Sequence, residues 1–241
     1  MVAARDRAGK DTRMSGSPSS PEWLAFDEGL KPGLRIWADQ PRARQHAAAA
    51  ERRGYASVVV DLPDESTAIA YIARTPAAAR NLAELERANL PGRQTSERLP
   101  PSGETDERLG VALGFPQCCV DAFVVRAKRG VDVLASGETT HEDHVAATEA
   151  AAATAVMHSL LNIYTLTPSA VWLSYVPCRF DCEPSLTYAA ELRTRYLQRF
   201  SDHCARIDEQ LGRAIAIHRD GRRSTVADAQ PGACLLRFDE P

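Results

Sequence analysis

Two pairs of cysteines, each close to a proline that suits the first turn of a helix, constrain this chain more than any other feature. The four residues are Cys118, Cys119, Cys178 and Cys182. Pro116 precedes the first pair and Pro184 follows the second. Proline is favoured in the first turn of a helix, where its missing N–H costs no hydrogen bond. We therefore expect both pairs to lie at the starts of helices.

A helix start is a favourable place for a sulfur anion. Its first N–H groups have no partner within the helix, and its dipole is positive there. Both effects favour the thiolate, which is the form of cysteine that binds metals and attacks electrophiles. If the two helix starts face each other, the four sulfurs form one site.

The number of cysteines argues against a disulfide framework. Six cysteines in 241 residues are too few to staple a chain of this length. In a reducing compartment, closely spaced cysteines are more often metal ligands or redox groups. Cys204 and Cys234 stand alone, in a predicted helix and a predicted strand, and are expected to be packing residues.

An iron–sulfur cluster of the 4Fe-4S type is the first prediction for the four-cysteine site. Such clusters are held by four cysteine thiolates. Adjacent residues of a helix point about 100° apart, which suits two ligands on two different irons better than two ligands on one ion. On this argument the adjacency of Cys118 and Cys119 favours a cluster.

Three alternatives stay open at this point. Structural zinc takes cysteine pairs separated by two to four residues, which Cys178 and Cys182 satisfy and Cys118 and Cys119 do not. A metal-free redox site is less favoured, because neither pair is a C-x-x-C motif. Cysteines also serve as small buried hydrophobic residues without any chemical role.

The pattern of a doubled cysteine followed by a second close pair resembles the QueH-type epoxyqueuosine reductases. In that family, paired cysteines hold a four-iron cluster beside a redox centre. The resemblance covers only the four cysteine positions. The second pair is separated by three residues here and by two in that family, whose doubled cysteine also lies near the N-terminus. The resemblance implies a cluster on these cysteines and no particular substrate. LGFPQCC and PCRFDC are also similar to motifs of a bacterial and archaeal family.

Three polar residues are candidates for catalytic roles. Arg179 and Asp181 lie between the cysteines of the second pair. The arginine can bind an anionic substrate, and the aspartate can donate a proton or simply form a turn. His158 lies in the apolar stretch VMHSLLNIY, where it either packs in the core or approaches the cluster or a substrate.

These features predict an iron–sulfur protein that acts in redox or sulfur chemistry on a small molecule or a modified nucleoside. Its partners would be that small molecule or an electron-donor protein. Whether it is an enzyme depends on the ligand count: three cysteines leave one iron open for substrate or sulfide, and four favour electron transfer or a structural role. The alternative is a non-enzymatic domain with structural zinc that binds a protein partner.

The predicted fold is a helix-dominated α+β fold. A disordered leader is expected at 1–20, an α/β part at 21–92, a linker at 93–103 and a cysteine-bearing, mostly helical part at 104–241. In the α/β part, strands are predicted at 34–39 and 56–62, a helix at 40–54, and two helices within 64–92 that Pro76 divides. In the later part, helices are predicted at 104–115, 116–130, 141–164 and 184–215, and strands at 169–176, 214–218 and 233–238.

Charge and hydropathy limit which cellular compartment and which kinds of partner we expect for this chain. The net charge is −3, so no basic excess favours nucleic acid. No stretch approaches the roughly 18 apolar residues that a membrane helix requires. The N-terminus is charged and lacks the apolar run of a secretory signal. We therefore expect a cytoplasmic protein that is not embedded in a membrane.

Overall fold

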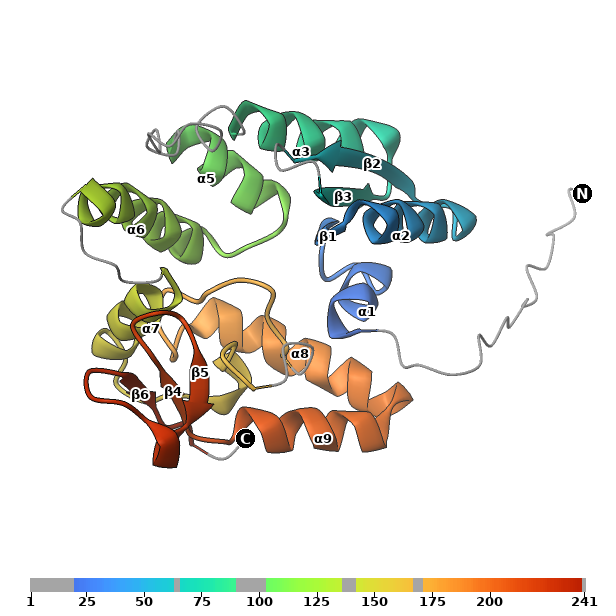
Figure 1. Cartoon of the computed structure of the whole chain (residues 1–241). Helices are drawn as coiled ribbons and strands as arrows, with labels where there is room; N and C mark the ends of the chain where they lie inside the picture. Colours follow the sequence, from blue (N-terminus) through green and yellow to red (C-terminus); the bar gives the residue numbers. More distant parts are fainter. Residues whose placement is uncertain (1–19, 63–65, 90–102, 136–141, 167–170, 240–241) are drawn as a thin grey trace, which may run out of the picture.

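The computed structural model describes residues 20–62, 66–89, 103–135, 142–166 and 171–239, without the side chains of 89, 128–135 and 142–143. Helices dominate these residues, and two small three-stranded sheets accompany them (Figure 1). The predicted helix-dominated α+β class is therefore confirmed. The predicted leader and linker lie outside the described residues, except for Ser20 and Gly103.

The first sheet lies in the N-terminal half of the chain. Its strands are β1 (Gly33–Asp39), β2 (Ala56–Asp61) and β3 (Thr67–Ala73), and helix α2 (Gln40–Arg52) connects the first two. The sheet order is β1-β3-β2, and β3 is antiparallel to both neighbours. The predicted strands at 34–39 and 56–62 and the helix between them are confirmed.

Strand β3 corrects the prediction of a helix before Pro76. Its residues from Ala68 to Ala73 are all buried, because strands lie on both sides and helices cover both faces. A fully buried strand shows no alternation of polar and apolar residues, so its sequence resembles that of a buried helix. Pro76 does begin a helix, α3 (Pro76–Asn89), so the predicted boundary holds.

The two faces of this sheet have separate cores. Helices α3 and α5 (Gly103–Ala112) pack on one face, against Ile69 and Tyr71. Helices α1 (Pro21–Asp27) and α2 cover the other face, where Phe26, Leu34 and Ile72 meet. Helix α1 was not predicted. Ser20 caps its start and Pro21 lies in its first turn, and both are local signals for a helix.

An ion pair lies within the first of these cores. The guanidinium of Arg35 donates to both carboxylate oxygens of Glu86 at 3.2 Å, and also to the Tyr71 hydroxyl at 3.0 Å. The Tyr71 hydroxyl in turn donates to Glu86, whose side chain is fully buried. This network ties β1, β3 and α3 together.

The C-terminal half contains the longer helices and the second sheet. Its helices are α6 (Gln117–Ala135), α7 (Glu142–Ala152), α8 (Glu183–Arg199) and α9 (Ser201–Leu211). The sheet order is β5-β4-β6, formed by Arg223–Thr225, Ile215–Ile217 and Cys234–Leu236. Strands β4 and β6 confirm the predictions at 214–218 and 233–238, whereas β5 was not predicted. Helix α6 continues past its predicted end at Gly130.

Helix α7 is shorter than the predicted helix at 141–164. It ends at Ala152, and the following loop pairs with the segment before Cys182. Phe180 N–H donates to the Thr154 hydroxyl at 2.7 Å, and His158 N–H donates to the Phe180 carbonyl at 3.0 Å. These tertiary hydrogen bonds replace the helical ones. The predicted strand at 169–176 is also wrong, since residues 171–176 form a loop.

The predicted single helix at 184–215 is two helices. Phe200 separates α8 from α9, with φ −142° and ψ 55°, outside the helical range. The two helices then fold back on each other, and Arg193 donates to both carboxylate oxygens of Asp208 at 2.9 and 3.0 Å. Tyr196 of α8 and Ile207 of α9 are both buried in the main core.

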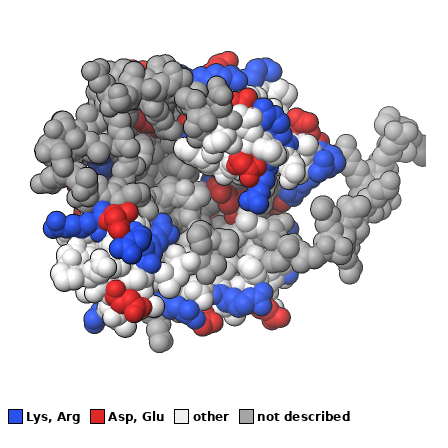
Figure 2. Space-filling model, in the orientation of Figure 1, with Lys and Arg blue, Asp and Glu red and all other residues white. Residues whose placement is uncertain are grey.

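Several contacts join the two halves. Helix α1 packs against α8, and Glu28 pairs with Arg195 and Arg199. The buried Lys31 donates to Glu22 at 2.6 Å and to Ser174, in the C-terminal half, at 2.8 Å. On the face that Figure 2 shows, acidic and basic side chains are intermixed. None of the described helices is long and apolar enough to cross a membrane.

The turn between α5 and α6 requires glycine at position 114. Gly114 has φ +82°, and a Cβ there would lie 2.6 Å from Cδ of Pro32. We expect Gly114→Ala to lower the free energy of unfolding by about 2–3 kcal/mol, through both the positive φ and the clash. Urea denaturation measures this loss. Gly54 is the matched control, because it has φ +83° and open space around it. Equal losses for the two alanine variants would show that Pro32 does not matter.

Candidate metal centre

The four predicted cysteines meet in space. Their Sγ atoms all lie within 4.8 Å of one another, although the two pairs are about sixty residues apart in the chain. The Sγ of Cys182 lies 3.7 Å from those of both Cys118 and Cys119, which are 4.0 Å apart. Among the described residues these four form the only such group of potential ligands. They could hold a metal ion.

Two helix starts bring the sulfurs together, as the prolines predicted. Cys118 and Cys119 lie in the first turn of α6, which begins at Gln117 after Pro116. Cys182 is the N-cap of α8, and Cys178 lies in the turn just before it. The prolines and the helix starts are local features. The meeting of α6 with α8 results from packing.

The adjacency of Cys118 and Cys119 proves compatible with one shared site. Side chains of a helix lean toward its N-terminus, and in the first turn no preceding turn blocks them. Both side chains can therefore reach the space in front of the helix, where their sulfurs are 4.0 Å apart. The expected divergence of about 100° between neighbours applies within a helix and is overcome at its end.

The spacing of the sulfurs fits a single tetrahedral ion. Four thiolates at about 2.3 Å from one zinc ion lie about 3.8 Å from each other. The separations among Cys118, Cys119 and Cys182 are 3.7, 3.7 and 4.0 Å. In a four-iron cluster each thiolate binds its own iron, so the sulfurs lie further apart than when they share an ion. The sulfurs, which all lie within 4.8 Å of one another, are therefore closer to the spacing of a one-ion centre than to that of a four-iron cluster.

Hydrogen bonds surround the sulfurs on the protein side. The backbone N–H of Cys178 donates to Sγ of Cys119 at 3.4 Å, and the Ser185 hydroxyl lies 3.4 Å from the same sulfur. The Tyr175 hydroxyl donates to that of Ser185 at 3.1 Å. Cys119 and Cys182 are buried in the main core of the C-terminal half, whereas Cys118 is exposed to solvent.

This environment shifts the pKa values of the thiols in different directions. Burial raises the pKa of Cys119 to about 12, against the opposing hydrogen bonds from Ser185 and Cys178. Burial and the neighbouring thiolates also raise the pKa of Cys178. Burial acts in the same direction on Cys182, but hydrogen bonds with Ser185, Cys178 and Cys118 together outweigh it and lower that pKa. A coordinated cation is what would hold all four as thiolates at neutral pH.

Tyr175 and Ser185 are parts of the site that were not among the predicted site residues. Ser185 lies one turn into α8 and is fully buried, and Tyr175 stacks on Phe115 with ring centroids 4.6 Å apart. The available signal was that Ser185 follows Cys182 by three positions in the sequence. That spacing places a hydroxyl on the same side of the helix start as the N-cap residue.

We expect Ser185→Ala to weaken metal binding, since residues that orient the ligands typically contribute about 10–100-fold to affinity. Competition with a chromophoric chelator measures the dissociation constant. Ser201→Ala is the control, because Ser201 is an exposed serine at the start of α9. Unchanged affinity in Ser185→Ala would exclude a supporting role for this hydroxyl.

The predicted catalytic residues lie outside the ligand group, and two of them, Arg179 and Asp181, lie between Cys178 and Cys182 in the chain. Arg179 is exposed and donates to the carboxylate of Asp181 at 2.7 Å. The other oxygen of Asp181 accepts from the Ala155 N–H at 3.1 Å. Burial opposes ionisation of Asp181, but these hydrogen bonds and the charge of Arg179 lower its pKa. His158 is half-buried and pairs through its backbone with Phe180 and Asp239. Catalytic roles for the three residues stay predictions.

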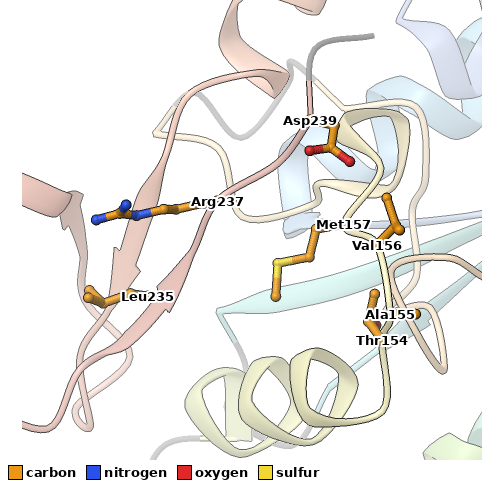
Figure 3. A pocket seen from close by; sticks show the side chains of 7 residues that line it. All are labelled: Thr154, Ala155, Val156, Met157, Leu235, Arg237 and Asp239. Carbon is orange, nitrogen blue, oxygen red and sulfur yellow. The ribbon is translucent and has the colours of Figure 1, made fainter.

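An open hollow of about 420 Å³ lies beside the loop that follows α7 (Figure 3). Residues 154–157 form one wall, and Leu235, Arg237 and Asp239 form the other. None of the four cysteines lines it. It adjoins the segment between Cys178 and Cys182 through two of its lining residues: the Ala155 N–H donates to Asp181, and the Thr154 hydroxyl accepts from the Phe180 N–H. The hollow is therefore a separate feature from the cluster of sulfurs.

Comparison with known proteins adds no family to these observations. The chain matches no protein-family model, no curated protein and no solved structure.

Proposed function

We propose that this chain is a metal-binding domain whose four thiolates hold one structural zinc ion, and that it acts by binding a protein partner. The observation that supports this most directly is the set of sulfur separations, 3.7–4.0 Å for three of the pairs. Tetrahedral sites of four sulfurs are typical of zinc or iron. Zinc structural sites are closed by four protein ligands.

A closed set of ligands favours a structural role over a catalytic one. Catalytic zinc keeps one position for water or substrate, whereas four cysteines occupy all four. The ion would join the start of α6 to the start of α8, and so connect the α5–α6 hairpin to the C-terminal core. The structure would then present a stable surface to a partner.

Elemental analysis and the absorption spectrum of the full chain, purified without oxygen, test the proposal. One zinc per chain and no absorption above 300 nm are the expected results. One iron with a thiolate charge-transfer spectrum would keep the one-ion geometry and reject zinc. Four irons with acid-labile sulfide and a brown colour would reject both. Full reactivity of all six thiols with a thiol reagent, with no metal, would reject metal binding.

A 4Fe-4S cluster acting in redox or sulfur chemistry is the second candidate function. The resemblance to the QueH-type reductases and the exposed position of Cys118 support it, since an exposed ligand lets a small molecule or a donor protein approach the cluster. The sulfurs would have to move apart to admit four irons. Arg179, Asp181 and His158 are its candidate substrate-binding and proton-transferring residues.

A further inference from the structure

The four sulfurs differ strongly in their access to solvent. Cys118 is exposed, Cys178 is half-buried, and Cys119 and Cys182 retain only 2% and 4% of their surface. A small oxidant from solution therefore meets Cys118 first. Susceptibility to oxidation follows both exposure and thiolate character. Coordination would supply the thiolate character at Cys118.

We infer that Cys118 is the oxidation site of this centre, and that hydrogen peroxide links it to Cys182 and thereby releases the metal ion. The inference rests on the proposed one-ion site for the released metal. The sulfurs of Cys118 and Cys182 are 3.7 Å apart. A disulfide of about 2.05 Å requires them to close by about 1.7 Å, or under about 1 Å for each sulfur.

The geometry selects Cys182 over the nearer neighbour in sequence. Consecutive Cα atoms are about 3.8 Å apart across a trans peptide, below the range of about 4.4–6.8 Å that disulfides use. A Cys118–Cys119 disulfide would thus distort the first turn of α6. Cys119 and Cys182 are also 3.7 Å apart, but both are buried from the oxidant.

The reaction balances with hydrogen peroxide as the only oxidant. The Cys118 thiolate attacks one peroxide oxygen, the O–O bond breaks, and hydroxide leaves to take up a proton. The sulfur is then a sulfenic acid. The Cys182 thiolate attacks that sulfur, the S–S bond forms, the S–O bond breaks, and a second hydroxide takes up a proton. Two thiolates lose two electrons, peroxide gains them, and two waters form.

The product keeps its helices joined. Of the four ligands, only Cys119 and Cys178 then remain as thiols, and two ligands are too few to close a tetrahedral zinc site. The new disulfide spans the same two helix starts that the ion joined, α6 and α8. Metal release would therefore not separate the two elements, and a dithiol reductant would restore the ligand set.

The test treats the zinc-loaded full chain with hydrogen peroxide. A chromogenic chelator follows zinc release, and mass spectrometry of peptides maps the disulfide. We expect one zinc released for every two thiols lost and a predominant Cys118–Cys182 link. Cys118→Ser should slow peroxide-dependent release by about tenfold or more, because the exposed thiolate is gone. Cys234→Ser is the control, since Cys234 is half-buried and lies on β6, and it should behave like the wild type.

Several outcomes would overturn the inference. These are a predominant link between Cys119 and Cys182, first oxidation at Cys178, or unchanged release from Cys118→Ser. If Cys118→Ser does not retain zinc, disulfide mapping on the metal-free wild-type chain decides, because the preferred link follows from the same sulfur positions. A chain purified without zinc that still forms the Cys118–Cys182 link would reject the proposed function and keep the assigned oxidation site.

Discussion

Cys182→Ser is expected to abolish metal retention and to lower the free energy of unfolding by about 4 kcal/mol, measured with zinc buffered at about a thousandfold above its dissociation constant. Cys182 is central to the site, since its sulfur lies 3.7 Å from two of the other three. Zinc content and chemical denaturation provide the two measurements. A strong chelator should destabilise the wild type by a similar amount and leave the variant unaffected.

Cys204→Ala separates loss of metal from loss of packing. Cys204 is fully buried in the same core, but it lies on α9 beside Asp208, outside the four-cysteine group. This variant should lose about 1 kcal/mol by truncation of a small buried side chain, and should retain its zinc. The proposed ligand set is wrong if Cys182→Ser retains a full equivalent of metal. It is also wrong if the chelator destabilises the wild type and Cys182→Ser equally.

Arg35→Met is expected to destabilise the N-terminal half by about 3 kcal/mol, because it removes the cation that pairs with a fully buried carboxylate. Glu86 has no exposed side-chain surface, and Arg35 donates to both of its oxygens. The charge of Glu86 helps to raise the pKa of Arg35, although burial opposes it. Thermal or urea unfolding, followed by circular dichroism, measures the loss.

A double-mutant cycle tests the coupling of these two residues. Arg35→Met combined with Glu86→Gln removes both charges, and should be more stable than Arg35→Met alone. Arg44→Met is the matched control, because Arg44 and Asp61 form an ion pair in which both side chains are about half exposed. A loss in Arg35→Met no larger than that in Arg44→Met would contradict a structural role for the buried pair.

Local signals in the sequence accounted for much of the fold. Strands β1 and β2 and helix α2 were predicted correctly, and so was the start of α3 at Pro76. A proline or a glycine with its own conformational preference lies at or near an end of each element, at positions 33, 41, 54, 63 and 76. The helix-dominated class followed from the same signals.

The failures occurred where tertiary contacts outweigh these preferences. Strand β3 reads as a helix because it is buried on both faces, between β1 and β2. Helix α7 ends early, and the chain that follows it binds Phe180 through the Thr154 hydroxyl and the His158 N–H. The break at Phe200 allows α9 to fold back against α8. No residue inside these segments marks such events on its own.

For the metal centre too, some features follow from the local sequence and others only from the tertiary structure. The residue types, their place at helix starts and the thiolate chemistry follow from local sequence alone, because a proline and the first turn act over only a few residues. That Cys118 and Cys119 meet Cys178 and Cys182 depends on the packing of α6 against the C-terminal core.

Only the tertiary structure supplies the distances between the sulfurs, and those distances bear on the choice of metal. Adjacency in the sequence favoured a cluster, since neighbours within a helix diverge. At the end of α6 the two side chains instead lean into the same space, so sulfurs 4.0 Å apart suit one ion. The sequence argument and the structure differ because the direction of each cysteine side chain depends on where its helix ends and on what packs there. The spacing of the cysteines along the chain does not contain that information.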